Sequence, residues 1–259
     1  MAPPIVTLTT DFGLGDGYVG TMHGVILGLC PEARIVDISH DIAPQDIRQA
    51  AFVLEGAYRF FPAGTVHVAV VDPGVGSARR PIAVQIATAC FVAPDNGLLT
   101  PILEAEPVLA QVQLTRPAYW LPQVSRTFHG RDVFAPVAAY LARGVALLDL
   151  GEPATDLARL PWPRPTLQPD GAIAGQVLYV DRFGNLITDV PGEMLAESVA
   201  IEIAGRRIES LSPAYAAAAP GQLVALISSG GRLEIAVREG SAARELGVGP
   251  GEPVRIRPL

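Results

Sequence analysis

Five short segments of this 259-residue chain place charged or polar side chains beside glycines. The first, VVDPGVGSARR at 70–80, puts Asp72 at the end of an apolar run and returns Arg79 toward it after a tight turn. Such a pair can simply close a surface turn, in which case it contributes little to stability. It can also orient a polar ligand, and we favour this functional interpretation.

The segment TTDFG at 9–13, followed by Asp16, carries two carboxylates on a glycine-rich loop before an expected helix. Asp11 and Asp16 would suit ribose hydroxyls and an ammonium group. An ordinary Asp turn with a helix N-cap explains the same residues equally well. The glycine spacing does not match a dinucleotide-binding fingerprint.

The segment FHGRD at 128–132 places His129 beside a glycine, where a ligand would find room. An isolated histidine is more often structural than catalytic. Of the four histidines, His129 is the one in a glycine-flanked loop, because His23 fits a helix and His67 a strand. His40, in Ser39-His40-Asp41, is the competing candidate.

Two segments in the second half, YVDRFGN at 179–185 and SSGGRLE at 228–234, combine an aromatic ring, amide and hydroxyl groups. An aromatic ring can stack on a purine, and an Asn amide can both donate to and accept from its edge. Each segment is also a plausible β-turn.

The elements that must position these side chains alternate in the first half. The expected strands are 4–8, 34–38, 66–71, 82–86 and 90–93, and the expected helices are 18–29, 46–60 and 134–142. This alternation predicts an α/β fold with a central, mostly parallel sheet covered by helices. Because Asp11 and Asp72 each follow a strand and Asp37 lies near the end of one, they could share the carboxyl edge of that sheet, where chemistry gathers.

A proline-rich stretch at 153–170 is typical of an interdomain linker. Beyond it the expected strands are 174–180, 186–189, 199–203, 223–228, 233–237 and 253–257. The sequence therefore predicts an α/β domain at 1–152 and a smaller all-β, barrel-like domain at 171–259.

Composition excludes several classes of function. The formal net charge of −7 disfavours a nucleic-acid partner. The sequence contains no lysine, which excludes Schiff-base chemistry and Walker-type phosphate binding. Two cysteines are too few for a disulfide framework, and no signal-like or membrane-spanning apolar segment is found, so we expect a cytoplasmic protein without a membrane partner.

Taken together, six ordered motifs resemble the S-adenosylmethionine (SAM) hydroxide adenosyltransferase family, which is related to fluorinases and chlorinases. They are TTDFG, VVDPGVGSARR, APDNGLLT at 93–100, FHGRD, DRFGN and SSGGRLEIA, and they cover nearly the whole chain. The resemblance implies hydrolysis of SAM at the ribose C5′ carbon to adenosine and methionine. It also implies an α/β domain followed by a β-barrel, and a homotrimer with active sites at subunit interfaces.

The resemblance assigns roles residue by residue. Asp72, Arg79 and His129 would be the catalytic set, in which Arg79 stabilises developing hydroxide while Asp72 and His129 orient water and accept its proton. The residues expected to bind substrate are Asp11 at the ribose, Asp16 near the methionine, and Phe183, Asn185, Ser229, Glu234 and Val237 around the adenosine. No metal or organic cofactor is expected, because the sulfonium leaves as neutral methionine.

The chain departs from the fluorinase pattern in ways that favour water as the nucleophile. Fluorinases carry Tyr where Asp72 stands and Tyr-Ser where His129-Gly130 stand, and they have a long insertion near 87–89. One difference is a departure from the family itself: Ser228 stands where the family usually has Asn, so the amide of that residue is missing.

Three alternatives remain open from the sequence. They are a halide-using relative, a SAM- or adenosine-binding protein with negligible turnover, and a metal-dependent phosphoesterase using Asp11, Asp37, His40 and Asp41.

Overall fold

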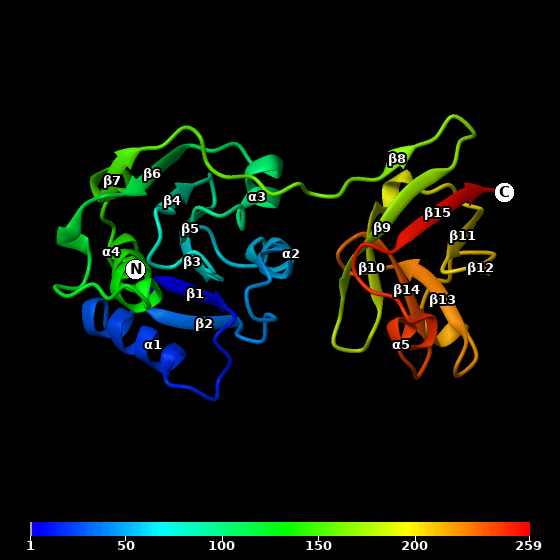
Figure 1. The fold of residues 1–259 in the computed structure, drawn as a ribbon, viewed down its shortest axis with the longest axis horizontal. Coiled ribbons are helices and arrows are strands. Elements are labelled where there is room, and N and C mark those ends of the chain that lie inside the picture. Colours follow the sequence, from blue (N-terminus) through cyan, green and yellow to red (C-terminus); the bar gives the residue numbers. More distant parts are fainter. Residues whose placement is uncertain (1) are drawn as a thin grey trace. The chain divides into compact units, whose positions relative to one another are not determined.

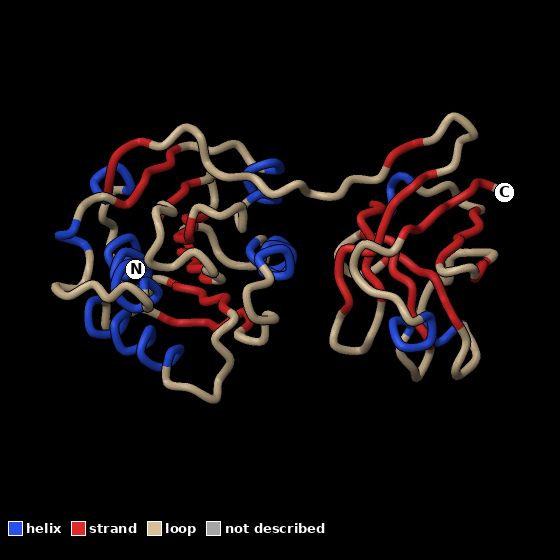
Figure 2. The backbone as a smooth tube through the Cα atoms, viewed as in Figure 1, coloured by secondary structure: helices blue, strands red, loops and turns tan. Residues whose placement is uncertain are grey.

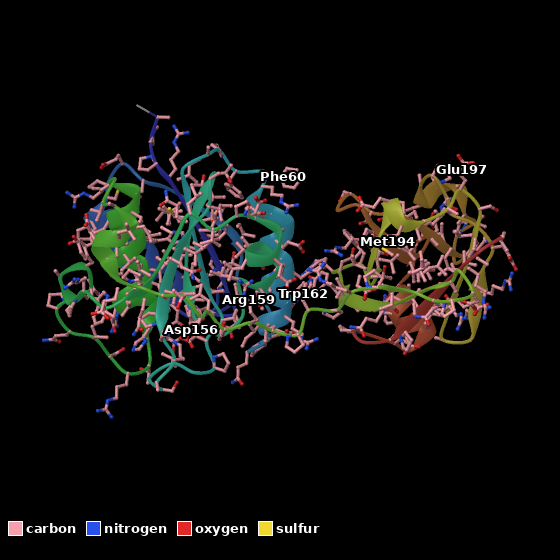
Figure 3. The ribbon with its side chains drawn as sticks, turned by 90° about the horizontal axis from the view of Figure 1, so that it is seen from above. Phe60, Asp156, Arg159, Trp162, Met194 and Glu197 are labelled. Atoms are coloured by element: carbon pink, nitrogen blue, oxygen red, sulfur yellow. The ribbon has the colours of Figure 1, made fainter. Side chains whose placement is uncertain are left out.

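The chain folds into two compact units. The computed structural model describes residues 2–259, so Met1, with which the first predicted domain begins, lies outside the described residues. One unit ends at Pro161 and the other comprises Trp162–Leu259. Figure 3 labels Asp156 and Arg159 shortly before this division and Trp162 directly after it. The division falls within the proline-rich segment predicted as a linker.

The first unit is built on a seven-stranded sheet in the order β2-β1-β3-β5-β4-β6-β7. Its strands are β1 (Ile5–Thr10), β2 (Arg34–Ser39), β3 (Thr65–Val70), β4 (Pro81–Gln85), β5 (Ala89–Pro94), β6 (Ala110–Leu114) and β7 (Gly151–Pro153). Strands β1, β2, β3 and β5 pair in parallel, whereas the β4–β5, β4–β6 and β6–β7 pairs are antiparallel. The mostly parallel α/β sheet predicted from the alternation is confirmed.

Helices cover both faces of this sheet (Figure 1). The core on one face includes α1 (Tyr18–Leu29) and α4 (Ala135–Ala142), and the core on the other includes α2 (Ile47–Tyr58) and α3 (Thr100–Ala105). Helix α2 begins where the Asp46 carboxylate accepts a 2.9 Å hydrogen bond from Gln49 N, an ordinary N-cap. Three single turns complete the unit: η1 (Pro117–Tyr119), η2 (Gly130–Phe134) and η3 (Leu147–Leu150).

The second unit is almost entirely strand and loop (Figure 2). Its sheet follows the order β12-β11-β15-β9-β10-β14-β13, with β8 paired to β9. The elements are β8 (Thr166–Leu167), β9 (Ile173–Val180), β10 (Leu186–Pro191), η4 (Gly192–Met194), β11 (Val199–Ile203), β12 (Arg206–Ile208), η5 (Tyr215–Ala217), β13 (Leu223–Ile227), β14 (Arg232–Val237), α5 (Ala242–Leu246) and β15 (Pro253–Pro258). A bridge from Leu211 to Ala225 of β13 draws the two ends of the sheet together, and the barrel-like prediction is confirmed.

Sequence patterning misses short elements and overestimates the linker. β6, β7, α3 and α5 span only 3–6 residues each, too few for a clear period. Residues 154–158 belong to the first unit, since Ala154 and Leu157 are buried in its core and Arg80 binds the exposed Asp156 carboxylate at 2.7 Å. Within residues 2–259, the helices are too short or too polar to cross a bilayer.

The buried imidazole of His67 makes the stability of this fold depend on pH. His67 lies in β3, its Nδ1 2.8 Å from Thr7 Oγ1 and its ring stacked on Phe91 with centroids 5.2 Å apart. Burial disfavours the charged ring and lowers its pKa from 6.5 to about 4.

We therefore expect acid to destabilise the chain. Between pH 6.5 and about 4 the unfolded chain takes up a proton at His67 that the native state excludes, so the free energy of unfolding falls as pH falls. Urea denaturation across this range measures it. A His67→Gln variant should lose part of the pH dependence, and an identical slope in the variant would contradict the assignment.

Candidate active site

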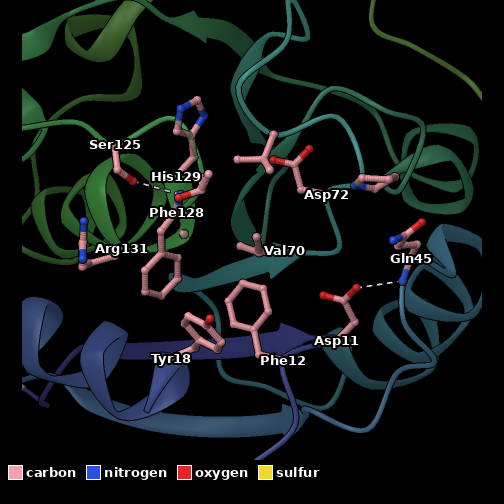
Figure 4. A pocket seen from close by; sticks show the side chains of 14 residues that line it. Asp11, Phe12, Tyr18, Gln45, Val70, Asp72, Ser125, Phe128, His129 and Arg131 are labelled. Carbon is pink, nitrogen blue, oxygen red and sulfur yellow. Dashed lines mark hydrogen bonds between the residues drawn. The ribbon is translucent and has the colours of Figure 1, made fainter. Parts of the chain in front are cut away.

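A cavity of about 730 Å³ opens in the first unit, close to the ends of β1 and β3. Its size suits a small organic ligand. Figure 4 shows the side chains around it. They are Asp11, Phe12, Tyr18, Gln45, Val70, Asp72, Pro73, Val75, Ser125, Thr127, Phe128, His129, Gly130 and Arg131.

A tight turn carries Asp72 and Arg79 to the same place. Val75 N donates to Asp72 O at 3.2 Å, and Ser77 Oγ donates to Gly74 O at 2.6 Å while accepting from Arg79 N. Gly76 has φ +78°, and a Cβ there would lie 2.4 Å from Arg126 O. Only glycine lets this turn approach the backbone that leads to His129.

Arg79 joins the other two predicted catalytic residues. Its Nε lies 2.9 Å from both carboxylate oxygens of Asp72, its Nη2 also donates to Oδ2, and the same Nη2 lies 2.9 Å from His129 Nδ1. The side chains of Arg79 and Asp72 are only 9% and 5% exposed, so the pair is nearly buried. Asp72 and His129 line the cavity, whereas Arg79 lies behind them.

The loop that carries His129 is held by a buried carboxylate. Asp132 accepts hydrogen bonds from Ser125 N at 2.8 Å and from Arg131 Nε at 2.6 Å. Asp132 lies in the single π-helical turn η2, a feature common at functional sites. A Cβ on Gly130 would lie 3.1 Å from the Phe128 ring, so a larger residue there would require that ring to shift by a few tenths of an ångström.

The contacts of His129 fix its state. Arg79 can only donate, so Nδ1 must accept, and the neutral ring then carries its proton on Nε2. Burial lowers the pKa of His129 below its usual 6.5, and the charge of Arg79 lowers it further. The opposite effect on the pKa comes from the negative charges of Asp72 and Asp132 and from a hydrogen bond with the Ser125 backbone. These raise the pKa of His129 but do not reverse the shift. The imidazole is therefore neutral at physiological pH.

Asp11 lies across the cavity from His129 (Figure 4), and a hydrogen bond holds its carboxylate. Its Oδ2 accepts a 2.8 Å hydrogen bond from Gln45 N, drawn in Figure 4. Gln45 has φ +67°, an uncommon backbone conformation for a residue other than glycine. A strained residue that orients a carboxylate in a cavity is typical of a ligand-binding site.

The aromatic wall of the cavity was not predicted from the sequence. Phe12, Tyr18 and Phe128 pack together, with ring centroids 5.1–5.8 Å apart. Phe12 and Phe128 lie within the motifs TTDFG and FHGRD, so the signal was present beside the charged residues. The sequence offered no comparable sign of Gln45, because its role comes from the backbone.

The barrel unit has a second cavity, of about 510 Å³, which three of the predicted adenosine residues line: Phe183, Asn185 and Val237. Phe183 is 75% exposed, while Asn185 is buried and its Nδ2 donates to Asp181 Oδ2 at 3.0 Å. Tyr215, which sequence analysis did not single out, also lines this cavity.

The remaining predicted substrate residues lie outside both linings. Asp16 is exposed in the turn before α1, and Ser229 is exposed in the turn between β13 and β14. Glu234 is 3% exposed on β14, where it accepts a hydrogen bond from Tyr215 OH. Burial raises the pKa of Glu234.

Known proteins are similar to this chain over nearly its whole length. Residues 6–151 match the family model described as SAM hydroxide adenosyltransferase N-terminal domain, and residues 175–255 match its C-terminal domain. A Salinispora tropica protein named (R)-S-adenosyl-L-methionine hydrolase is 45% identical over 99% of each chain. A fluorinase from Nocardia brasiliensis is 29% identical over 98% of this chain and 97% of its own.

A solved structure is also similar. The crystal structure of an uncharacterized conserved protein from Thermotoga maritima superposes with a TM-score of 0.91 and 35% identity, covering 97% of this chain and 99% of that one.

The Arg79 contact predicts how His129 titrates. Replacing Arg79 by Gln removes a positive charge beside the ring, so the pKa of His129 should rise from its depressed value. NMR titration of the imidazole measures the change. Arg80→Gln is the matched control, because Arg80 pairs with Asp95 and Asp156 instead. An unchanged His129 pKa in the Arg79 variant would refute the coupling.

Proposed function

The chain belongs to the SAM hydroxide adenosyltransferase family, and we propose that it is a hydrolase that converts SAM and water to adenosine and L-methionine. The observation that carries the proposal is the contact of Arg79 with both Asp72 and His129 at the wall of a ligand-sized cavity. Because the Salinispora tropica relative is named for the (R) epimer of SAM, we propose the same epimer as substrate.

The reaction is a substitution at the ribose C5′ carbon. The oxygen of water forms a bond to C5′ while the C5′–S bond breaks. The electron pair of the C5′–S bond stays on sulfur. The cationic sulfonium thus becomes the neutral thioether of methionine, and one proton of the water must leave. Catalysis therefore needs an in-line water and a proton acceptor rather than an acid for the leaving group.

We assign proton acceptance to Asp72. His129 presents its Nδ1 lone pair to Arg79 and carries its proton on Nε2, so it has no free lone pair for the water. The carboxylate of Asp72 lines the cavity, and its Oδ1, which accepts from Arg79 Nε alone, has a further lone pair, whereas Oδ2 accepts from both Nε and Nη2. Arg79 is then a positioning residue that holds the base and the imidazole in one arrangement.

The proposed substrate contacts lie in and beside the two cavities. We propose that Asp11 binds the ribose hydroxyls, and that Phe12, Tyr18 and Phe128 shield the reacting carbon from bulk solvent. Phe183, Asn185 and Val237 in the barrel cavity would bind adenosine, with Glu234 and Ser229 beside them and Asp16 near the methionine, as the resemblance implies.

We propose that no metal or organic cofactor takes part, because the leaving group departs neutral without a Lewis acid. A halide-using activity is the second candidate, supported by the fluorinase relatives. Against it stands Asp72, a carboxylate at the cavity wall that would repel an anionic nucleophile.

Purified protein incubated with the (R) epimer of SAM should yield adenosine and methionine by chromatography. Chelator should not change the yield, and chloride or fluoride should produce no halogenated nucleoside. Absence of any product would leave only a SAM-binding protein. A halogenated nucleoside would favour the second candidate.

Asp72→Asn should reduce kcat by about 10²- to 10⁴-fold, the usual contribution of a general base, while SAM binding stays measurable by calorimetry. Asp156→Asn is the matched control, since it also removes a carboxylate charge from an ion pair with arginine but lies outside the cavity lining. Equal turnover in the Asp72 variant would refute its assignment as base.

Following the resemblance, we propose a homotrimer with active sites at subunit interfaces. Light scattering should then give three times the chain mass of 27.2 kDa. If two subunits share each site, mixing inactive Asp72→Asn with a barrel variant impaired in adenosine binding, Asn185→Ala, should restore part of the activity. A monomeric mass, or mixtures without any recovery, would contradict shared sites.

We also propose a cytoplasmic location. The described structure contains two free thiols, the buried Cys30 and the half-buried Cys90. Burial raises the pKa of both thiols, which keeps them protonated and unreactive. Free thiols of this kind are typical of a reducing compartment, and fractionation of the source cells would test the location.

A further inference from the structure

Three side chains outside the cavity lining come together at the edge of the first unit's sheet. His23 lies on α1, Asp37 on the edge strand β2, and His40 directly after that strand. His23 Nε2 lies 2.9 Å and His40 Nε2 3.1 Å from the same oxygen, Asp37 Oδ1. One ligand atom from each residue lies within 4.8 Å of the other two.

The two separations from Asp37 Oδ1, 2.9 and 3.1 Å, are close to those between ligands of one metal ion. Ligand atoms about 2.1 Å from one ion, at angles between octahedral and tetrahedral, lie about 3.0–3.4 Å apart. Two imidazole nitrogens and one carboxylate oxygen are ligands that Zn²⁺, Co²⁺ and Ni²⁺ accept, whereas Mg²⁺ and Ca²⁺ prefer oxygen alone.

The orientation of His40 is a second, independent observation. Its side chain is only 3% exposed, and its Nε2 makes no well-aligned hydrogen bond with any described residue, although Asp37 Oδ1 is close. A buried imidazole nitrogen directed into a group of potential ligands is what a metal site provides.

The other edge of the His40 ring is already held. Its Nδ1 lies 2.8 Å from Thr10 Oγ1, and its backbone carbonyl accepts a 2.9 Å hydrogen bond from Gly13 N. Metal-binding histidines are usually oriented by such a bond at the second ring nitrogen. His23 and Asp37 are 31% and 37% exposed, so an ion could enter from solvent and keep water in its remaining positions.

We propose that His23, Asp37 and His40 form a binding site for one divalent transition-metal ion of the Zn²⁺ or Co²⁺ type. The site lies beside the loop that begins at Asp11, through Thr10 and Gly13, so the ion would brace that loop from outside the cavity. It takes no part in the substitution at C5′, and the proposal does not depend on the proposed hydrolase activity.

The test uses full-length protein without a histidine tag, first stripped with chelator. Titration with Co²⁺ should give one visible absorption band that saturates at one equivalent per chain, and Zn²⁺ should displace it. Zn²⁺ should also raise the melting temperature, because an ion that binds only the folded chain stabilises it, whereas Mg²⁺ should not.

Variants separate coordination from hydrogen bonding. His23→Gln keeps a donor for Asp37 but removes the imidazole ligand, so it should abolish the band at unchanged metal-free melting temperature. His23→Ala should do the same, and Asp41→Asn, an exposed carboxylate outside the cluster, should bind like the unmodified chain. Absence of saturable Co²⁺ binding, or binding equally strong in His23→Gln, would overturn the proposal.

Discussion

The arrangement of the site depends on one nearly buried guanidinium. Arg79 holds the Asp72 carboxylate through two nitrogens and meets His129 with one of them, and the three residues come from loops 50 positions apart. Removing one partner of a buried ion pair costs about 3–5 kcal/mol, so each of these two charges depends on the presence of the other. Contacts elsewhere hold the two loops in place. Gly76 lets the turn after Asp72 approach the Arg126 backbone, and the buried Asp132 accepts a hydrogen bond from Ser125 N in the loop before His129.

The same guanidinium sets the chemistry available to its neighbours. Because arginine donates and never accepts, it selects the His129 tautomer whose Nδ1 lone pair accepts from it, and burial, followed by the charge of Arg79, lowers the pKa of that imidazole. A neutral, engaged histidine is a poor proton acceptor. This supports the proposal that Asp72 is the base among the three, a division of roles that residue types alone could not suggest.

The two units offer different kinds of surface to a ligand. The α/β unit offers carboxylates and a wall of three aromatic rings, which suit a cationic substrate that must be kept from bulk water. The barrel unit offers an exposed ring, Phe183, beside a buried amide, Asn185, which suit a flat heterocycle. Each set is incomplete for a molecule that carries both an adenosine and a sulfonium, which is consistent with the proposed trimer.

The sequence by itself determined the classes of fold, the motifs and the family, because strand and helix periods are local and six ordered motifs leave few alternatives. It also identified Asp72, Arg79 and His129 as candidates. Only the tertiary structure decided that Arg79 lies behind its partners, that Gln45 orients Asp11 through its backbone, and that His23, Asp37 and His40 meet at a sheet edge. The physical reason is that directions of side chains, hydrogen-bond partners and burial are set by contacts between distant segments, and a local pattern carries no record of them.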